Sequence, residues 1–193
     1  FYDIDGGSIT LDGESIYDIP KKKLRGSIGI VLQDTVIFND TIMQNIRYGR
    51  LDATDEEVIA AAKTAKVADF AEKMADGYDT MLTEGGGNLS QGQRQLIAIA
   101  RAVLADPKIL ILDEATSSID TRTEVHIQEA MLALMKGRTS LIIAHRLSTI
   151  RDADKIVVID GGKVVEAGNH EKLLSENGAY ARLYNTQFAG IKT

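Results

Sequence analysis

The 193-residue chain contains no cysteine and no tryptophan, and only two prolines. Without cysteine, a disulfide framework and a thiolate metal site are both excluded, and a reducing compartment is the simpler assumption. Long apolar runs are also missing, because the longest are short pieces such as "ILIL" and "SLIIA", whereas a membrane-spanning helix needs about 18 residues. We therefore expect that this chain does not itself cross a membrane.

Positive charge is in deficit, with 22 lysines and arginines against 28 acidic residues and a net charge of −6. Nucleic-acid-binding proteins usually present a basic face, so this balance argues against a nucleic-acid partner. The length suits one ordinary domain with a sizeable core and room for an inserted lobe.

The order of patterns along the chain predicts an α/β protein. Two hairpins are expected, at Asp12-Gly13 and at 160–162. Helices are expected from Thr54 to Gly77, from Ser90 to just before Pro107, and as one C-terminal amphipathic helix from about 171. The runs "SIGIVLQD", "KILILDE" and "TSLIIAH" predict strands, and the continuous apolar character of the last two indicates parallel strands buried on both faces.

The stretch "NLSQGQRQLIAIARA" predicts an unusual helix start. Ser90 and Gln93 have the spacing of a capping box, in which each side chain bonds the other residue's backbone N–H. Gly92 is not explained by capping, because glycine in a first helical turn costs about 1 kcal/mol relative to alanine. We infer that a group approaches this backbone closely, and helix N-termini attract phosphate.

Polar side chains follow three of the expected strands: Gln33, the pair Asp113-Glu114, and His145. Ligands of open parallel sheets bind outside the carboxyl ends of the strands. One carboxylate of such a pair can hold a divalent cation while the other accepts a proton from water, as phosphoryl transfer requires. Taken singly, each residue also has a structural interpretation, as a turn residue, a first-turn helix acid or a strand-end cap.

Taken together and in this order, these motifs resemble the nucleotide-binding domain of the ATP-binding cassette (ABC) family, in particular its exporter branch. "LSQGQRQ" resembles the signature motif, "ILILDE" the Walker B strand with its glutamate, and "IVLQD" the Q-loop. "SSID" is similar to the D-loop and "AHRLSTI" to the switch-histidine loop. The resemblance covers essentially the whole chain.

The resemblance implies a role for each candidate residue. Asp113 and Gln33 would help to hold Mg²⁺, Glu114 would polarise the attacking water, and His145 would contact the γ-phosphate of ATP. Ser90, Gly92 and Gln93 would face ATP bound on a second, opposing cassette, and Asp120 would lie at the dimer interface while also capping its own helix.

The resemblance further implies a P-loop NTPase-like α/β core, residues 1–34 and 106–193, with an inserted α-helical subdomain at about 35–105. The expected cofactors are ATP and Mg²⁺. The expected partners are a second cassette and a membrane-spanning domain, contacted through the surface between about Asp34 and Gly49, at the cytoplasmic face of the cell membrane.

One family element is missing, because no G-x-x-x-x-G-K-[ST] sequence occurs, so the loop and lysine that cradle the phosphates are absent. In the family this loop, its helix and an adenine-stacking aromatic residue precede the segment that "FYDIDGG" resembles. We therefore expect that the N-terminal part of the cassette is missing upstream of Phe1, and that this fragment alone neither binds ATP tightly nor hydrolyses it. Two alternatives stay open: a soluble ABC-type ATPase unconnected with transport, and an inactive fragment that serves as a dimerisation module.

Overall fold

A computed structural model describes residues 3–32, 35–113, 119–143 and 150–188. The chain divides into two compact units, Phe1–Ile143 and Ala144–Thr193, which are described separately below.

The first unit begins with the predicted hairpin, strands β1 (Thr10–Leu11) and β2 (Glu14–Ser15). These strands pair antiparallel around Asp12 and Gly13, whose φ angles are 50° and 87°. Two consecutive positive φ angles are typical of the type I′ turn that an Asp-Gly pair favours. Helix α1 (Lys21–Ser27) then leads directly into the sheet.

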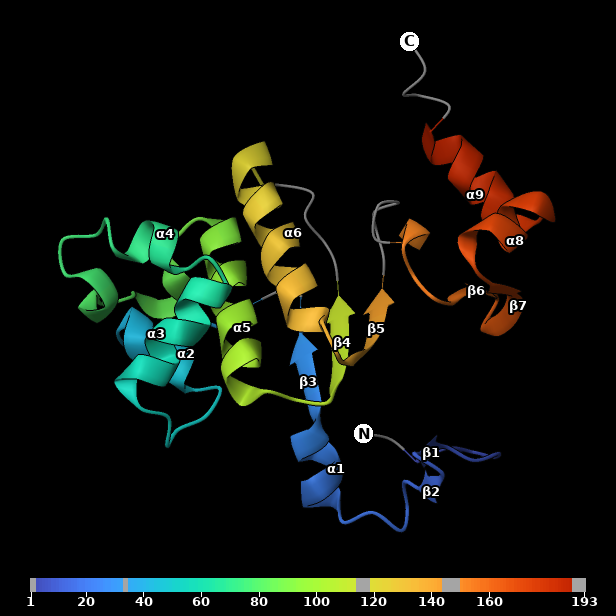
Figure 1. Ribbon diagram of the computed structural model, residues 1–193, viewed down its shortest axis with the longest axis horizontal. Coiled ribbons are helices and arrows are strands. Elements are labelled where there is room, and N and C mark those ends of the chain that lie inside the picture. The colour runs from blue at the N-terminus through green and yellow to red at the C-terminus, as the bar shows by residue number, and fades with distance from the viewer. Residues whose placement is uncertain (1–2, 33–34, 114–118, 144–149, 189–193) are drawn as a thin grey trace. The chain divides into compact units, whose positions relative to one another are not determined.

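Three parallel strands form the central sheet, in the order β3 (Ile28–Val31), β4 (Ile109–Asp113) and β5 (Thr139–Ile143) (Figure 1). In register, Leu112 lies between Val31 on β3 and Ile142 on β5. Because the strands are parallel, their carboxyl ends lie along one edge of the sheet, as the sequence predicts.

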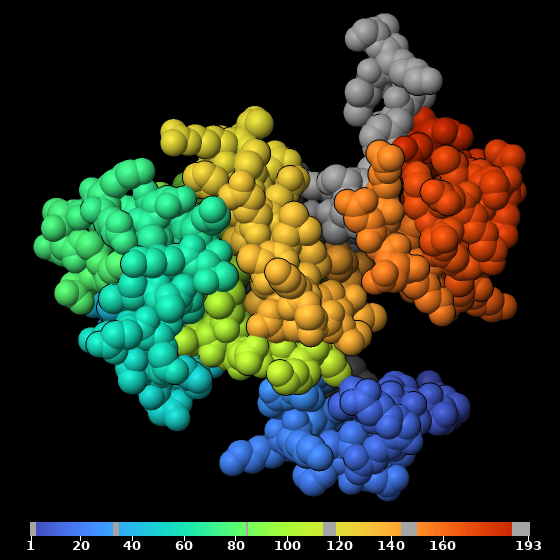
Figure 2. Space-filling view, viewed as in Figure 1, coloured from blue at the N-terminus to red at the C-terminus, as the bar shows by residue number. Residues whose placement is uncertain are grey.

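Between β3 and β4 the described residues form helices α2 (Ile42–Arg47), α3 (Asp55–Thr64), α4 (Ala68–Ala71) and α5 (Gln91–Ala105). The short 3₁₀ turns η1 (Gly77–Asp79) and η2 (Glu84–Gly86) lie between α4 and α5. Helix α6 (Thr121–Met135) connects β4 to β5 and packs against α5. Figure 2 shows α6, in yellow to orange, alongside the helices of the 42–105 segment, in cyan to green.

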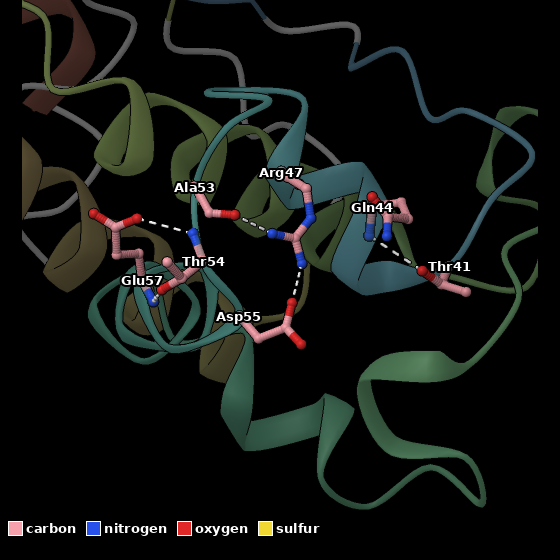
Figure 3. A network of polar contacts seen from close by, with 7 residues as sticks. All are labelled: Thr41, Gln44, Arg47, Ala53, Thr54, Asp55 and Glu57. Carbon is pink, nitrogen blue, oxygen red and sulfur yellow. Dashed lines mark hydrogen bonds and ion pairs between the residues drawn. The ribbon is translucent and has the colours of Figure 1, made fainter.

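Side-chain capping sets the start of α3 (Figure 3). Thr54 accepts the backbone N–H of Glu57 at 3.3 Å, and Glu57 accepts that of Thr54 at 2.9 Å, which confirms the predicted capping box. Arg47 at the end of α2 donates to the carbonyl of Ala53 and pairs with Asp55. These contacts join the end of α2 to the start of α3.

The prediction of one helix from Thr54 to Gly77 is wrong, because α3 ends at Thr64. Lys66 has φ 60°, and the N–H of Val67 bonds the carbonyl of Ala62 at 2.8 Å. This pattern is a Schellman motif, which normally favours glycine at the left-handed position. Val67 is fully buried, so burial of this apolar side chain stabilises a helix end that the sequence does not announce.

Helix α5 matches its predicted start and end. The helix ends at Ala105, and Asp106 follows in the left-handed conformation with φ 48°. The next residue is Pro107, and proline cannot continue a helix. The buried face of α5 contributes to the main core, together with β4 and α6. The largest fully buried side chains of these three elements are Leu96, Ile97, Ile99, Leu110, Leu112 and Leu134.

The prediction that the strands are buried on both faces is wrong for β5 within the described residues. Leu141 and Ile143 on β5 are 59% and 56% exposed, and Ile30 on the same face of β3 is 50% exposed. Burial alternates along β4 as well, where Leu110 and Leu112 are fully buried and their neighbours are only half-buried. One face of the sheet packs on the core, and the other presents large apolar side chains.

In the described part of the second unit, the predicted hairpin is followed by two helices. Strands β6 (Ile156–Asp160) and β7 (Lys163–Gly168) pair antiparallel. Helix α8 (His170–Ser175) is separated from α9 (Ala179–Phe188) by Asn177, which has φ 50°. The prediction of one continuous C-terminal helix is therefore wrong, because the left-handed residue and Gly178 end α8.

None of the helices in the described residues has the length and apolar character needed to cross a membrane.

Candidate nucleotide site

Asp113 is the last residue of β4 and its side chain is half-buried. It lies in register with Ile143, the last residue of β5, at the edge formed by the carboxyl ends of the strands. The structure thus places this carboxylate where the sequence predicts it. Gln33, Glu114 and His145 lie outside the described residues.

The start of α5 has the capping box that the sequence predicts. Ser90 Oγ accepts the N–H of Gln93 at 3.2 Å, and Gln93 Oε1 accepts the N–H of Ser90 at 2.9 Å. The first four N–H groups of a helix have no partner within the helix, and the capping box satisfies two of them. Among the described residues, the N–H groups of Gln91 and Gly92 have no hydrogen-bond partner.

Gly92 is buried, and the structure provides a reason for glycine that the sequence does not reveal. A Cβ atom at this position would lie 2.2 Å from Cγ2 of Thr123 and 3.2 Å from Cγ2 of Ile119. Close packing of α5 on the first turn of α6 therefore requires that residue 92 has no side chain. This packing brings the starts of the two helices together.

Asp120 caps α6, as predicted, because its Oδ1 accepts the N–H of Thr123 at 3.0 Å. This backbone hydrogen bond lowers the pKa of Asp120, since the charged form is the better acceptor. Ser90 caps α5 and Asp120 caps α6. Because Gly92 packs against Thr123, these two helix starts are adjacent.

Sequence reasoning missed Arg101 and Asn45. The side chain of Asn45 is 1% exposed, and it bonds the backbone of the residues before α2 as well as Arg101. Arg101 also donates to the carbonyl of Val36 at 2.6 Å and lies 5.2 Å from the ring centroid of Phe38. The sequence does offer one signal for Arg101. It follows Ile97 by four residues, which places a charged side chain on the apolar side of α5.

Within the described residues, no group of three or more histidine, cysteine or acidic side chains could hold a metal ion. Asp113 still fits Mg²⁺, because this ion prefers hard oxygen ligands and usually takes only one or two carboxylates, together with water and substrate phosphates.

Comparisons with known proteins identify a family and relatives that share this sequence and fold. The family model described as ABC transporter matches residues 1–117. The uncharacterized ABC transporter ATP-binding protein YfiC of Bacillus subtilis is 57% identical over 188 residues, which cover 97% of this chain and 31% of the relative. The ATP-dependent lipid A-core flippase of Hahella chejuensis is 54% identical, over 98% of this chain and 32% of the relative.

A solved structure described as a bacterial Atm1-family ABC exporter with ATP bound is also similar. It matches with a TM-score of 0.88 and 48% identity, over 96% of this chain and 32% of that one. The chain thus spans about a third of the length of these relatives. The predicted ABC ATPase-type α/β fold is confirmed, and the chain belongs to the ABC transporter family.

Proposed function

We propose that this chain is part of the ATP-binding and ATP-hydrolysing domain of an ABC exporter, and that hydrolysis in a head-to-tail pair of such domains powers transport. The observation that carries the proposal is the match, at 48% identity over 96% of the chain, to an exporter with ATP bound. Residues 35–105 would form the helical subdomain and the remainder the catalytic core.

The edge of the sheet would hold the metal and the reacting water. Asp113 would bind Mg²⁺ together with Gln33, and the metal would neutralise charge on the phosphates. Glu114 would accept a proton from the attacking water, and His145 would donate a hydrogen bond to the γ-phosphate. The position of Asp113 at the end of β4 supports this arrangement.

The start of α5 would act on nucleotide that is bound to the opposing domain. Because the N–H groups of Gln91 and Gly92 have no partner in the part of the chain that the structure describes, this helix start would offer donors to a phosphate oxygen. Ser90 and Gln93 would border the same phosphate, and Asp120 would lie at the interface between the two domains.

The exposed apolar face of the sheet supports a further segment, the phosphate loop with its strand and helix, which the resemblance places before Phe1. Ile30, Leu141 and Ile143 offer it a surface to bury. Burying such side chains stabilises a fold by about 1.5–3 kcal/mol each.

The contact with the membrane-spanning domain would lie on the segment from about 34 to 49, at the cytoplasmic face of the cell membrane. Phe38 and Tyr48 present partly exposed rings on this segment, with centroids 4.4 Å apart, next to the exposed Val36. Exposed aromatic side chains are frequent anchors in protein interfaces.

The test is ATP hydrolysis by the intact polypeptide that carries this sequence, reconstituted in lipid vesicles. Glu114→Gln should lower kcat at least about 100-fold, because a positioned general base contributes about 10²–10⁴. Glu72→Gln, an exposed substitution directly after α4 with the same change of charge, should have no effect. An unchanged rate in Glu114→Gln would reject the catalytic assignment and favour the dimerisation-module alternative.

A further inference from the structure

A cavity of about 160 Å³ opens between α4, the start of α5 and the first turns of α6. One water molecule needs only about 15 Å³, so the cavity can take a small molecule. Leu96 and Phe70 contribute apolar walls. The polar lining comes from Lys66, Asp69, Lys73, Gln93, Arg122 and His126.

Two of the charged lining groups are engaged by neighbours. Lys66 pairs with Glu129, a residue of α6 outside the lining, at 3.0 Å, and this carboxylate raises the pKa of Lys66. Asp69 lies 3.9 Å from His126 across the cavity wall. The carboxylate of Asp69 is therefore directed to the imidazole of His126.

The other two charged groups, Lys73 and Arg122, have side chains that make no hydrogen bond or ion pair with any residue that the structure describes. Because Lys66 is paired with Glu129, the charges left to face the cavity are those of Lys73 and Arg122 against the single carboxylate of Asp69. This local excess occurs in a chain whose net charge is −6.

We propose that this cavity binds a small phosphate-bearing anion, held between Lys73 after α4 and Arg122 on α6. A guanidinium can donate two parallel N–H groups to a phosphate, and a lysine adds a mobile point charge. The side-chain amide of Gln93 lines the same cavity, so the bound anion would link the helical segment to the starts of α5 and α6. The proposal does not depend on ATP hydrolysis.

The proposal can be tested by hydrogen exchange measured by mass spectrometry on the intact polypeptide, without nucleotide or Mg²⁺. Titration with inorganic phosphate at constant ionic strength should slow exchange in peptides covering 66–74 and 120–127, with a dissociation constant on the order of millimolar. Lys73→Gln with Arg122→Gln should weaken this response about tenfold or more, because two charge-assisted hydrogen bonds are lost.

A matched control separates a site from general electrostatics. Lys63→Gln with Lys136→Gln removes the same charge from exposed positions outside the cavity, and it should leave the response to phosphate unchanged. An equal loss in both double variants, or no response in the parent protein, would overturn the proposal. The single variant Lys73→Gln gives the same readout if the double variant folds poorly.

Glycerol phosphate identifies the source of the anion. Tighter binding of this ester than of inorganic phosphate would indicate a phosphorylated metabolite, and equal binding would indicate the free ion; both results support recognition of the phosphate group. A response to chloride as strong as that to phosphate would contradict it.

Discussion

The guanidinium of Arg101 donates to both oxygen atoms of Asn45, with Nε 2.6 Å from the backbone oxygen and Nη2 2.7 Å from Oδ1. The two residues are 56 positions apart, and their contact holds α5 against the start of α2. Gly49 adds to this contact, because a Cβ there would lie 2.2 Å from the carbonyl oxygen of Arg101.

Arg101→Met should destabilise the first unit. The substitution removes the donors to the part-buried backbone oxygen of Asn45 and to its Oδ1, which keeps the N–H of Phe38. A buried acceptor left unsatisfied costs about 1–3 kcal/mol. We expect a loss of about 3 kcal/mol in the free energy of unfolding by urea, with a smaller loss for Arg101→Lys. Lys63→Met, on the exposed face of α3, is the control and should be near neutral. A loss below about 1 kcal/mol for Arg101→Met would show that these hydrogen bonds are replaced by water.

Gly92→Ala should destabilise the contact of α5 with α6 by about 1–3 kcal/mol, as overpacking does. Thr123→Ser removes the methyl group that lies 2.2 Å from the added Cβ, so it should recover most of this loss in the double variant. A double-mutant cycle in urea measures the coupling. If stability returns in the double variant but the ATPase activity of the intact polypeptide does not, Gly92 is also needed for phosphate to approach the backbone. Additive destabilisation by the two substitutions would contradict the packing explanation.

Glu166 should make the second unit sensitive to acid. The N–H of Tyr180 donates to its Oε2 at 3.0 Å and the N–H of Ala179 to its Oε1, and these bonds lower the pKa of Glu166. A depressed carboxyl pKa stabilises the fold above the unfolded value of 4.5, and this contribution is lost as the pH falls through the lower folded value.

The corresponding measurement is amide exchange in α9 for Glu166→Gln and the parent chain at the same pH. The variant should exchange faster than the parent at pH 7, and this difference should shrink as the pH is lowered, whereas the control Asp154→Asn should match the parent throughout. Equal protection of Glu166→Gln and the parent at pH 7 would refute the assignment.

The chain of residues 1–193 alone should self-associate through β5. This strand lies at the edge of the described three-stranded sheet and exposes Leu141 and Ile143, and such edges promote pairing between chains. Sedimentation velocity should show oligomers that Ile143→Lys reduces. Leu132→Lys, at an exposed apolar position of α6, should not reduce them. A monodisperse monomer would contradict this expectation.

Affinity for ATP provides a second measurement on the same isolated chain. Because the phosphate loop is absent from this sequence, we expect no micromolar binding of ATP in calorimetry. Micromolar affinity would show that Ser90, Asp113 and their neighbours suffice to hold the nucleotide.

Local signals in the sequence predict much of the fold. The Asp12-Gly13 turn, the capping boxes of α3 and α5, Pro107 and the apolar strand runs each act within a few residues, so the sequence displays them directly. The helix break at Lys66 escaped detection because burial of Val67, rather than a glycine, stabilises it.

Short-range spacing and periodicity are enough to reveal the family, the order of its motifs and the type and approximate position of most helices and strands. The packed fold is needed to show which face of the sheet is buried, that Gly92 accommodates Thr123, that Arg101 holds Asn45 and that Lys73 and Arg122 line one cavity. Each of these depends on contacts between residues tens of positions apart, and such contacts exist only once the helices have packed.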